Sequence, residues 1–342
     1  MESIYYIGLD VHKKTISFCI KTQDGQVLNR GMVEATRPSL RQWAGAIGRP
    51  WIGAMEATMF TGWVYDFLRP YALELKVAHP AMLKAITAAK KKSDRLDAEK
   101  ITDLLRCDFL PECYIAPEEI RELRRVLRYR NLMVREATRM KNKMAGLLME
   151  VGTPYNKKRL YGKKYFHNLL DNIEDVPDSV IQMLRLTRSS MEMFKGIQQQ
   201  LLEALAHEED IRDRVRRLMT IEGVGQVTAL TWVLEVGDPR RFGSVRQAVS
   251  YCGLSSAQKE SAGKNQRGPI SKKRNKHLQT MLIEAAKLAP RFNPELAEVY
   301  ARELQRSHRN RATLAVARKL IAFLLAVDRR QTDFVPRDMK AA

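Results

Sequence analysis

The spacing of apolar residues changes once along the chain, and this change limits the folds that the chain can adopt. Up to residue 78, short β-rich runs at 4–9, 15–20, 26–33, 51–55 and 73–78 predict five strands, with an Asp24-Gly25 turn between the second and third. Residues 38–47 and 62–68 suit helices. Three meandering strands, followed by helices and strands in alternation, predict an α/β layer fold.

From Pro117 onward the apolar residues follow helical spacing instead. One amphipathic stripe runs from Ile120 to Val151, and a second runs from Leu184 to Leu205. The two stripes predict an antiparallel helical hairpin of the coiled-coil type, whose tip at 154–172 is rich in Lys, Tyr and Gly.

A third region begins near Leu218. Residues 239–276 look irregular and basic, and helices return at 275–288 and 310–327, interrupted around Pro290. At about 150 residues per domain, 342 residues suit two domains and a connector. We therefore expect an α/β domain at 1–116, a helical hairpin at 117–212 and a mainly helical domain at 213–342.

The net charge of the chain indicates what kind of molecule it binds. The chain has 59 Lys and Arg against 39 Asp and Glu, a formal charge of +20, which favours a polyanion such as nucleic acid. The four cysteines form no CxxC pair, so neither a zinc site nor a disulfide framework is predicted. No apolar run reaches the ~18 residues of a membrane span, and no signal peptide is recognisable, so we expect a cytoplasmic protein without membrane partners.

Four carboxylates stand out by their positions. Asp10 and Glu56 each follow a predicted strand, where a sheet directs active-site side chains, and Asp94 and Asp97 lie three residues apart in a first helical turn after Ser93. Singly, each has an ordinary interpretation as a strand-end or dipole-favouring acid. Together they would repel one another unless a hard cation lies among them. We therefore predict Mg²⁺, with two ions possible and Mn²⁺ as a substitute.

The residues around these carboxylates resemble a known family. Residues 7–12 (IGLDVH), 55–58 (MEAT) and 92–98 (KSDRLDA) are similar to the DEDD-type insertion-sequence transposases, the group numbered one hundred and ten, which includes the Piv DNA invertases. The resemblance implies a ribonuclease-H-like N-terminal domain similar to the Holliday-junction resolvase RuvC. It also implies that Asp10, Glu56, Asp94 and Asp97 are catalytic and bind metal.

The C-terminal region contributes two further candidates. Gly223 and Gly225 sit in a turn that looks like a helix-hairpin-helix, where backbone N–H groups could approach phosphates, although a plain Gly-rich connector is equally consistent. The family resemblance extends to this turn and to residues 267–272. It implies that Ser261 is a nucleophile that forms a covalent link to DNA. No activating base is adjacent except Glu260.

Basic residues predict the nucleic-acid surface. Residues 121–143 carry nine Lys and Arg and only two acids, and the cations of the hairpin tip alternate with aromatic residues that could stack on unpaired bases, although a mobile basic loop is equally possible. The nucleic-acid-binding candidates are Lys91, Lys92, Arg95, Arg124, Arg128, Arg135, Lys158, Lys164, Gly223, Gly225, Lys264, Arg267, Lys272 and Lys273.

Taken with these residues, the resemblance implies a prokaryotic, nucleoid-associated recombinase that cuts and rejoins donor and target DNA. The resemblance implies guidance by a structured non-coding RNA from the element's own ends, and dimers that join as a tetramer. Two alternatives stay open: a metal-and-water endonuclease of the Holliday-junction type, and a non-catalytic nucleic-acid-binding scaffold. The sequence leaves open the target site, the strand that is cut, the number of metal ions, and whether the carboxylates and Ser261 act within one subunit.

Overall fold

The computed structural model describes residues 4–86, 94–261, 264–272 and 274–336, and it divides into two compact units, Met1–Glu118 and Glu119–Ala342. Each unit has its own hydrophobic core. Within the described residues, no helix is both long and apolar enough to cross a membrane.

The first unit is an α/β layer structure around a five-stranded mixed sheet. Its elements are β1 (Tyr5–Val11), β2 (Thr15–Lys21), β3 (Val27–Glu34), α1 (Arg37–Gly45), β4 (Trp51–Glu56), α2 (Thr61–Leu68), η1 (Arg69–Tyr71), β5 (Glu74–Ala78), α3 (Pro80–Ile86) and α4 (Asp94–Arg106). The strand order is β3-β2-β1-β4-β5, in which β1 pairs antiparallel with β2 and parallel with β4. All five strands and the first two helices were predicted from the sequence.

The two faces of this sheet have different partners. Ile7, Leu9 and Val11 of β1 point to the face where Leu40 of α1 and Val64 of α2 complete the larger core. The alternate residues point to the other face, where Ala54 and Ala78 meet residues of α4 in a smaller core. Asp10 alternates with Leu9 and Val11, so it belongs to the face that α4 covers.

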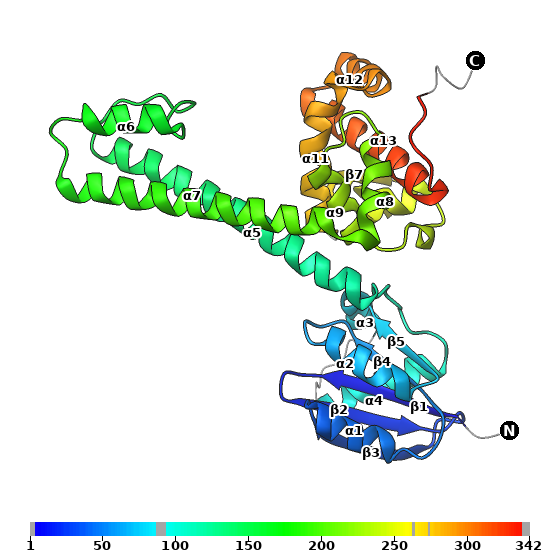
Figure 1. Cartoon of the computed structure of the whole chain (residues 1–342). Coiled ribbons are helices and arrows are strands. Elements are labelled where there is room, and N and C mark those ends of the chain that lie inside the picture. Colours follow the sequence, from blue (N-terminus) through cyan, green and yellow to red (C-terminus); the bar gives the residue numbers. More distant parts are fainter. Residues whose placement is uncertain (1–3, 87–93, 262–263, 273, 337–342) are drawn as a thin grey trace. The chain divides into compact units, whose positions relative to one another are not determined.

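The second unit is mainly helical. Its elements are α5 (Glu118–Glu150), α6 (Lys163–Asp171), α7 (Asp178–His207), α8 (Glu209–Met219), α9 (Gln226–Val236), η2 (Pro239–Arg241), α10 (Val245–Tyr251), β6 (Ser256–Ser261), β7 (Lys264–Ile270), α11 (Lys276–Leu288), η3 (Ala289–Arg291), α12 (Pro294–Arg306) and α13 (Arg309–Arg330). Figure 1 shows α5 and α7 side by side as long green helices with α6 at their tip. Met144 and Leu148 of α5 share a core with Leu184 and Met191 of α7, as expected for a hairpin.

Three segments of the second unit differ from the sequence-based expectation. Residues 239–276, predicted to be irregular, contain η2, α10 and the antiparallel β6–β7 hairpin. The predicted loop at the hairpin tip contains α6, and α12 lies in the interval that we expected to be interrupted around Pro290. The helix α12 begins with Asn293, whose side chain accepts a hydrogen bond from Leu296 N, and with Pro294 in the first turn, which is a strong start signal.

The contact between α4 and β1 depends on Gly8. A Cβ atom on Gly8 would lie 2.2 Å from the Ala98 carbonyl oxygen and 2.6 Å from the Thr102 backbone nitrogen. Both atoms belong to the helix backbone, so a side chain could be admitted only by moving α4 away from the strand.

We therefore expect Gly8→Ala to lower the free energy of unfolding by about 3 kcal/mol, because overpacking against backbone cannot relax through a rotamer change. Gly45→Ala is the matched control, since nothing lies within 4 Å of its added Cβ atom. Urea unfolding followed by circular dichroism measures both. Equal stability of the Gly8 and Gly45 variants would contradict the close approach.

Candidate active site

Two of the predicted carboxylates occupy neighbouring strands in the same row of the sheet. In the parallel pair β1–β4, Gly8 lies opposite Ala54 and Leu9 lies opposite Met55, so Asp10 and Glu56 are the next residues in this register. Both alternate onto the face that α4 covers. On the other side of β1, Asp10 is paired with Ser17, which is also buried. The sheet therefore places Asp10 and Glu56 on neighbouring strands, on the same face.

The other two carboxylates come from the beginning of α4. Asp94 is the first residue of this helix, and Asp97 directly precedes Ala98, the residue whose carbonyl oxygen faces Gly8. Residues three apart lie on one side of a helix, so Asp94 and Asp97 belong to the same side of α4. The Asp97 side chain is 31% exposed and lies 3.3 Å from the ammonium group of Lys100. The Asp94 and Arg95 side chains, Lys91 and Lys92 lie outside the described residues.

Asp10 is the most enclosed of the described candidate carboxylates. Its residue is 8% exposed, and its Oδ2 lies 3.1 Å from Nε2 of His12, whose side chain is half exposed. Burial of a carboxylate is costly without a positive or hydrogen-bonding partner, so this position favours a role that requires the charge. The sequence pattern did not indicate His12 as a partner of Asp10.

The candidate carboxylates are of the chemical type that binds a hard divalent cation. Asp10, Glu56 and Asp97 offer carboxylate oxygens, which Mg²⁺ and Mn²⁺ prefer. Among the side chains that the structure describes, no three His, Cys, Asp or Glu residues gather closely enough to hold a metal ion, and the Asp94 side chain is not among them. The fit therefore rests on donor type and on the shared face of the sheet.

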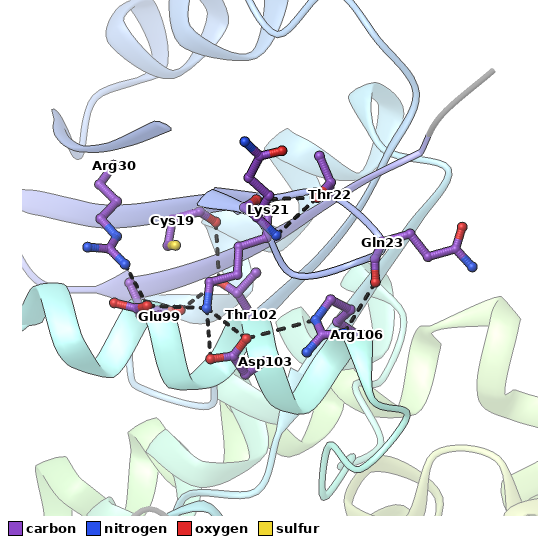
Figure 2. A network of polar contacts seen from close by, with 11 residues as sticks. Cys19, Lys21, Thr22, Gln23, Arg30, Glu99, Thr102, Asp103 and Arg106 are labelled. Carbon is purple, nitrogen blue, oxygen red and sulfur yellow. Dashed lines mark hydrogen bonds and ion pairs between the residues drawn. The ribbon is translucent and has the colours of Figure 1, made fainter. Parts of the chain in front are cut away.

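A polar network holds α4 in place on this face (Figure 2). Lys21, at the end of β2, donates to both carboxylate oxygens of Asp103 at 2.7 and 2.8 Å and lies 3.2 Å from Glu99. Arg30 of β3 donates to the same Glu99 at 2.5 Å. Because Glu99 is two residues from Asp97, these ion pairs restrain the helix segment that carries the candidate carboxylate.

The Lys21 ammonium is almost completely enclosed, with 6% of its side chain exposed. Burial alone would lower the pKa of Lys21, but the hydrogen bonds and charges of Asp103 and Glu99 outweigh it and raise the pKa of Lys21 above its usual value. The charged form is therefore the one that the fold stabilises.

Lys21 thus generates a pH prediction. A lysine whose pKa is raised on folding stabilises the protein below the unfolded-state value of about 10.4, and this contribution is lost as the pH rises through the folded-state pKa. We expect the wild type to lose more stability between about pH 9 and about pH 11.5 than Lys21→Met does. Urea unfolding at the two pH values measures this difference, with Lys84→Met, an exposed lysine of α3, as control. Identical pH slopes for wild type and Lys21→Met would refute the role of the network.

The predicted nucleophile lies in the second unit, at the end of a strand. Ser261 is the last residue of β6 and pairs with Lys264, the first residue of β7. A backbone hydrogen bond from Ser271 N to Ser255 O, 3.0 Å long, closes the base of this hairpin. The side chains of Ser261, Lys264 and Arg267, and all of Lys273, lie outside the described residues, while Lys272 is exposed.

The turn at 220–226 does join two helices, but its glycines have different roles. Gly223 has φ +88°, and a Cβ atom there would lie 2.7 Å from the Ala289 Cα atom. The close approach that Gly223 permits is therefore to the chain's own backbone. Gly225 is the N-cap of α9, and nothing lies within 4 Å of the position of a Cβ atom there, so of the two predicted phosphate-binding glycines it is the more open.

Two of the predicted nucleic-acid-binding arginines pair inside the protein. Arg128 donates to both carboxylate oxygens of Glu235 at 2.7 and 2.8 Å, and Arg124 donates to the Leu234 carbonyl oxygen at 2.7 Å. The Glu235 carboxylate is fully buried on α9 and also accepts from Asn275. Burial would raise the pKa of Glu235, but the hydrogen bonds and charge of Arg128 dominate and lower it. Arg124 and Arg128 thus connect α5 to α9 in this structure.

The hairpin tip combines exposed cations with partly buried aromatic residues. Arg135, Lys158 and Lys164 are exposed, as a phosphate-binding role requires. Phe166, however, is 2% exposed and belongs to the core that α5 and α7 share, so the expectation that it could stack on a base is wrong. Tyr155, Tyr161 and Tyr165 pack against the same core.

The buried Glu235 leads to a stability prediction. Arg128→Ala leaves a fully buried carboxylate without its bidentate partner, so we expect a loss of about 3 kcal/mol in the free energy of unfolding, and adding Glu235→Gln should restore part of it. The control Arg125→Ala removes an exposed pair with Glu122, where less than about 1 kcal/mol is expected. Urea unfolding decides this, and equal effects of the two arginine variants would contradict it.

Two protein-family models and several known transposases match this chain. The DEDD transposase model matches residues 7–152, and the model of the IS116/IS110/IS902 transposase family matches residues 215–301. The transposase of insertion sequence element IS1328 from Yersinia enterocolitica is 25% identical, covering 98% of this chain and 99% of its own length. The transposase of element IS1111A from Coxiella burnetii is also 25% identical, over 98% of this chain and 92% of its own.

A third relative, the transposase of element IS1533 from Leptospira borgpetersenii, is 23% identical over 70% of this chain and 71% of its own length. The DEDD match includes Asp10, Glu56, Asp94 and Asp97, and the second match includes Ser261 and both glycines of the 220–226 turn. The chain belongs to the IS110 family of DEDD transposases.

Proposed function

We propose that this transposase is a divalent-metal-dependent recombinase that cuts DNA and rejoins it through a serine-linked intermediate, guided by a structured non-coding RNA. The observation that carries the metal-dependent part is the placement of Asp10 and Glu56 in one row of neighbouring parallel strands, on the face that α4 covers. We further propose that this unit is a ribonuclease-H-like domain of the RuvC kind, which its mixed sheet supports.

The carboxylates have one chemical task in this proposal. Asp10, Glu56, Asp94 and Asp97 would hold Mg²⁺, as one or two ions, with Mn²⁺ as a substitute. Bound there, the metal would supply a Lewis acid for the phosphodiester oxygens. The chain itself would fix the positions of these carboxylates. Gly8 lets α4 lie directly on β1, and the hydrogen bonds of Lys21 to Asp103 hold α4 there.

Ser261 has the second task. Its Oγ would attack phosphorus, the bond from phosphorus to the departing deoxyribose oxygen would break, and the hydroxyl proton would pass to a base. The resulting phosphoserine keeps the energy of the phosphodiester, so a second strand's hydroxyl can attack it, reform a DNA phosphodiester and release the serine. The position of Ser261 at the end of β6 supports this role, because strand ends project from the body of a domain.

The remaining partners follow from charge and from the chemistry of exchange. A formal charge of +20 suits a protein that holds donor DNA, target DNA and guide RNA, and Arg135, Lys158 and Lys164 are exposed for phosphate contacts. Exchange between two duplexes needs four strand cuts, so we propose dimers that assemble into a tetramer.

A recombination assay between a donor and a target plasmid tests the mechanism. We expect Asp10→Asn and Ser261→Ala to reduce recombination by at least about 10³-fold, because each removes a group that acts on the phosphodiester, while nucleic-acid binding persists. The assay is run with and without RNA from the element's flanks, and protein–DNA adducts are sought on denaturing gels.

Matched controls separate chemistry from folding in this assay. Asp24→Asn changes an exposed turn residue, and Ser250→Ala changes an exposed serine of α10, so both should recombine normally. Cleavage that persists in Ser261→Ala without adducts would indicate a metal-and-water endonuclease instead. Cleavage by no variant under any divalent ion, with binding intact, would indicate a scaffold.

A further inference from the structure

A pocket of about 680 Å³ lies at the base of the β6–β7 hairpin, between the hairpin and α13. We call it the hairpin-base pocket. Its walls come from Ser255 and Ser256 at the start of β6, from Gly268, Pro269 and Ile270 at the end of β7, from Val249 of α10, and from the first three turns of α13. Its volume is in the range of ligand sites, and it is large enough for one nucleotide.

The charged groups that line this pocket are all cations or potential cations. Arg311 and Arg318 of α13 and His308 before it contribute to the wall, and no acid does so within the described part of the chain. Arg311 is exposed. Burial lowers the pKa of the Arg318 guanidinium and the neighbouring charge of Arg311 lowers it further, while the charge of Glu303 on α12, which does not line the pocket, partly opposes this shift. Two neighbouring arginines in a pocket that no described carboxylate lines are typical of an anion-binding site.

Arg318 is held in a fixed position. Its Nε donates to the Leu254 carbonyl oxygen at 2.8 Å, and Leu254 itself is fully buried, one residue before the pocket wall begins. A positioned guanidinium loses less freedom when it binds a phosphate than a solvent-exposed one does. This contact with a neutral carbonyl distinguishes Arg318 from Arg128, whose guanidinium forms a bidentate ion pair with Glu235.

The pocket also has an apolar wall. Val249, Pro269, Ile270 and Leu314 line it together with the cations. A bare phosphate would not use this wall, whereas the flat face of an unstacked base would. The combination of a cationic and an apolar wall therefore fits a nucleotide better than an inorganic anion.

The distance to Ser261 relates the pocket to the proposed chemistry. Ser256 and Ser261 are the two ends of β6, five residues apart, which spans roughly 17 Å at about 3.3 Å per residue. That length corresponds to about five nucleotides of a stacked strand. A strand that follows the hairpin could thus have one phosphate at Ser261 and another nucleotide in the pocket.

We propose that the hairpin-base pocket binds one unpaired nucleotide of the DNA strand that lies on the β6–β7 hairpin, with its phosphate on Arg311 and Arg318 and its base against Leu314 and Pro269. This proposal deepens the proposed function and rests on it for the identity of the strand. It assigns to α13 a role in strand positioning that the sequence patterns did not suggest.

The test measures binding by full-length protein in a Ser261→Ala background, so that it does not depend on catalysis. The probes are a fluorescent single-stranded DNA of about 12 nucleotides, the RNA of the same sequence and the DNA duplex, each titrated at several salt concentrations. The variants are Arg311→Glu and Leu314→Lys, with Arg291→Glu as the control, because Arg291 is an exposed arginine of η3 outside the pocket. Circular dichroism melting verifies that each variant folds.

We expect Arg311→Glu to weaken binding of single-stranded DNA by about tenfold or more and to reduce the salt slope by about 0.7, while Arg291→Glu has a clearly smaller effect. Leu314→Lys adds a positive charge, so a purely electrostatic surface would bind more tightly. A pocket that accommodates a base would bind more weakly, and weaker binding is the expected result.

Three outcomes would overturn the proposal: equal effects of Arg311→Glu and Arg291→Glu, tighter binding by Leu314→Lys, or an equal loss on duplex DNA. A loss confined to the RNA probe would assign the pocket to RNA and would also refute the DNA assignment. Adduct formation by the chain with Ser261 intact is scored separately. Absence of adducts with a working pocket would remove the serine mechanism alone, so the two failures are distinguishable.

Discussion

The candidate active site depends on one close contact, between the backbone of α4 and the strand β1 at Gly8. The Ala98 carbonyl oxygen lies where a Cβ atom would be, so the helix is seated directly on the strand that carries Asp10. Asp97 precedes Ala98, and Asp10 follows Gly8 by two residues on the same face. A contact of backbone on backbone fixes this spacing more firmly than side-chain packing would, because it has no rotamer to relax. The Lys21, Glu99 and Asp103 ion pairs add a second restraint, along the helix axis.

The sequence predicted this half of the molecule well, and the reason is physical. Each strand of the first unit is an apolar or alternating run with a clear boundary, so the local pattern is enough to locate it. What the sequence did not indicate was Gly8 as the seat of α4, or Lys21 as a partner of α4. Both relations join residues more than 80 positions apart, and the local pattern at each position is compatible with many tertiary neighbours.

The second unit was predicted less completely. The strands of the β6–β7 hairpin contain Ser, Gln, Lys, Glu, Asn and Arg, so they present no alternating apolar face that a pattern could detect, and their pairing rests on main-chain hydrogen bonds. The helix α12 was not predicted although Asn293 and Pro294 are helix start signals, because the nearby Pro290 indicates the end of a helix. A charge count also failed to separate cations that bind nucleic acid from cations that bind the protein. Arg128 pairs with Glu235, 107 residues further along the chain.

This distinction between paired and available cations decides where nucleic acid can bind. Arg124 and Arg128 belong to the basic stretch at 121–143, yet their guanidinium groups contact α9. In the sequence, Arg311 and Arg318 are part of an ordinary amphipathic pattern and were not predicted to bind nucleic acid. In the structure, they line a pocket to whose wall no described acidic residue contributes. The free energy of phosphate binding comes from charges that are not already neutralised, and it is greater when the side chain is held in position. In the second unit, Arg124 and Arg128 therefore serve to hold α5 to α9, whereas Arg311 and Arg318 support the proposal of a nucleotide pocket beside the β6–β7 hairpin.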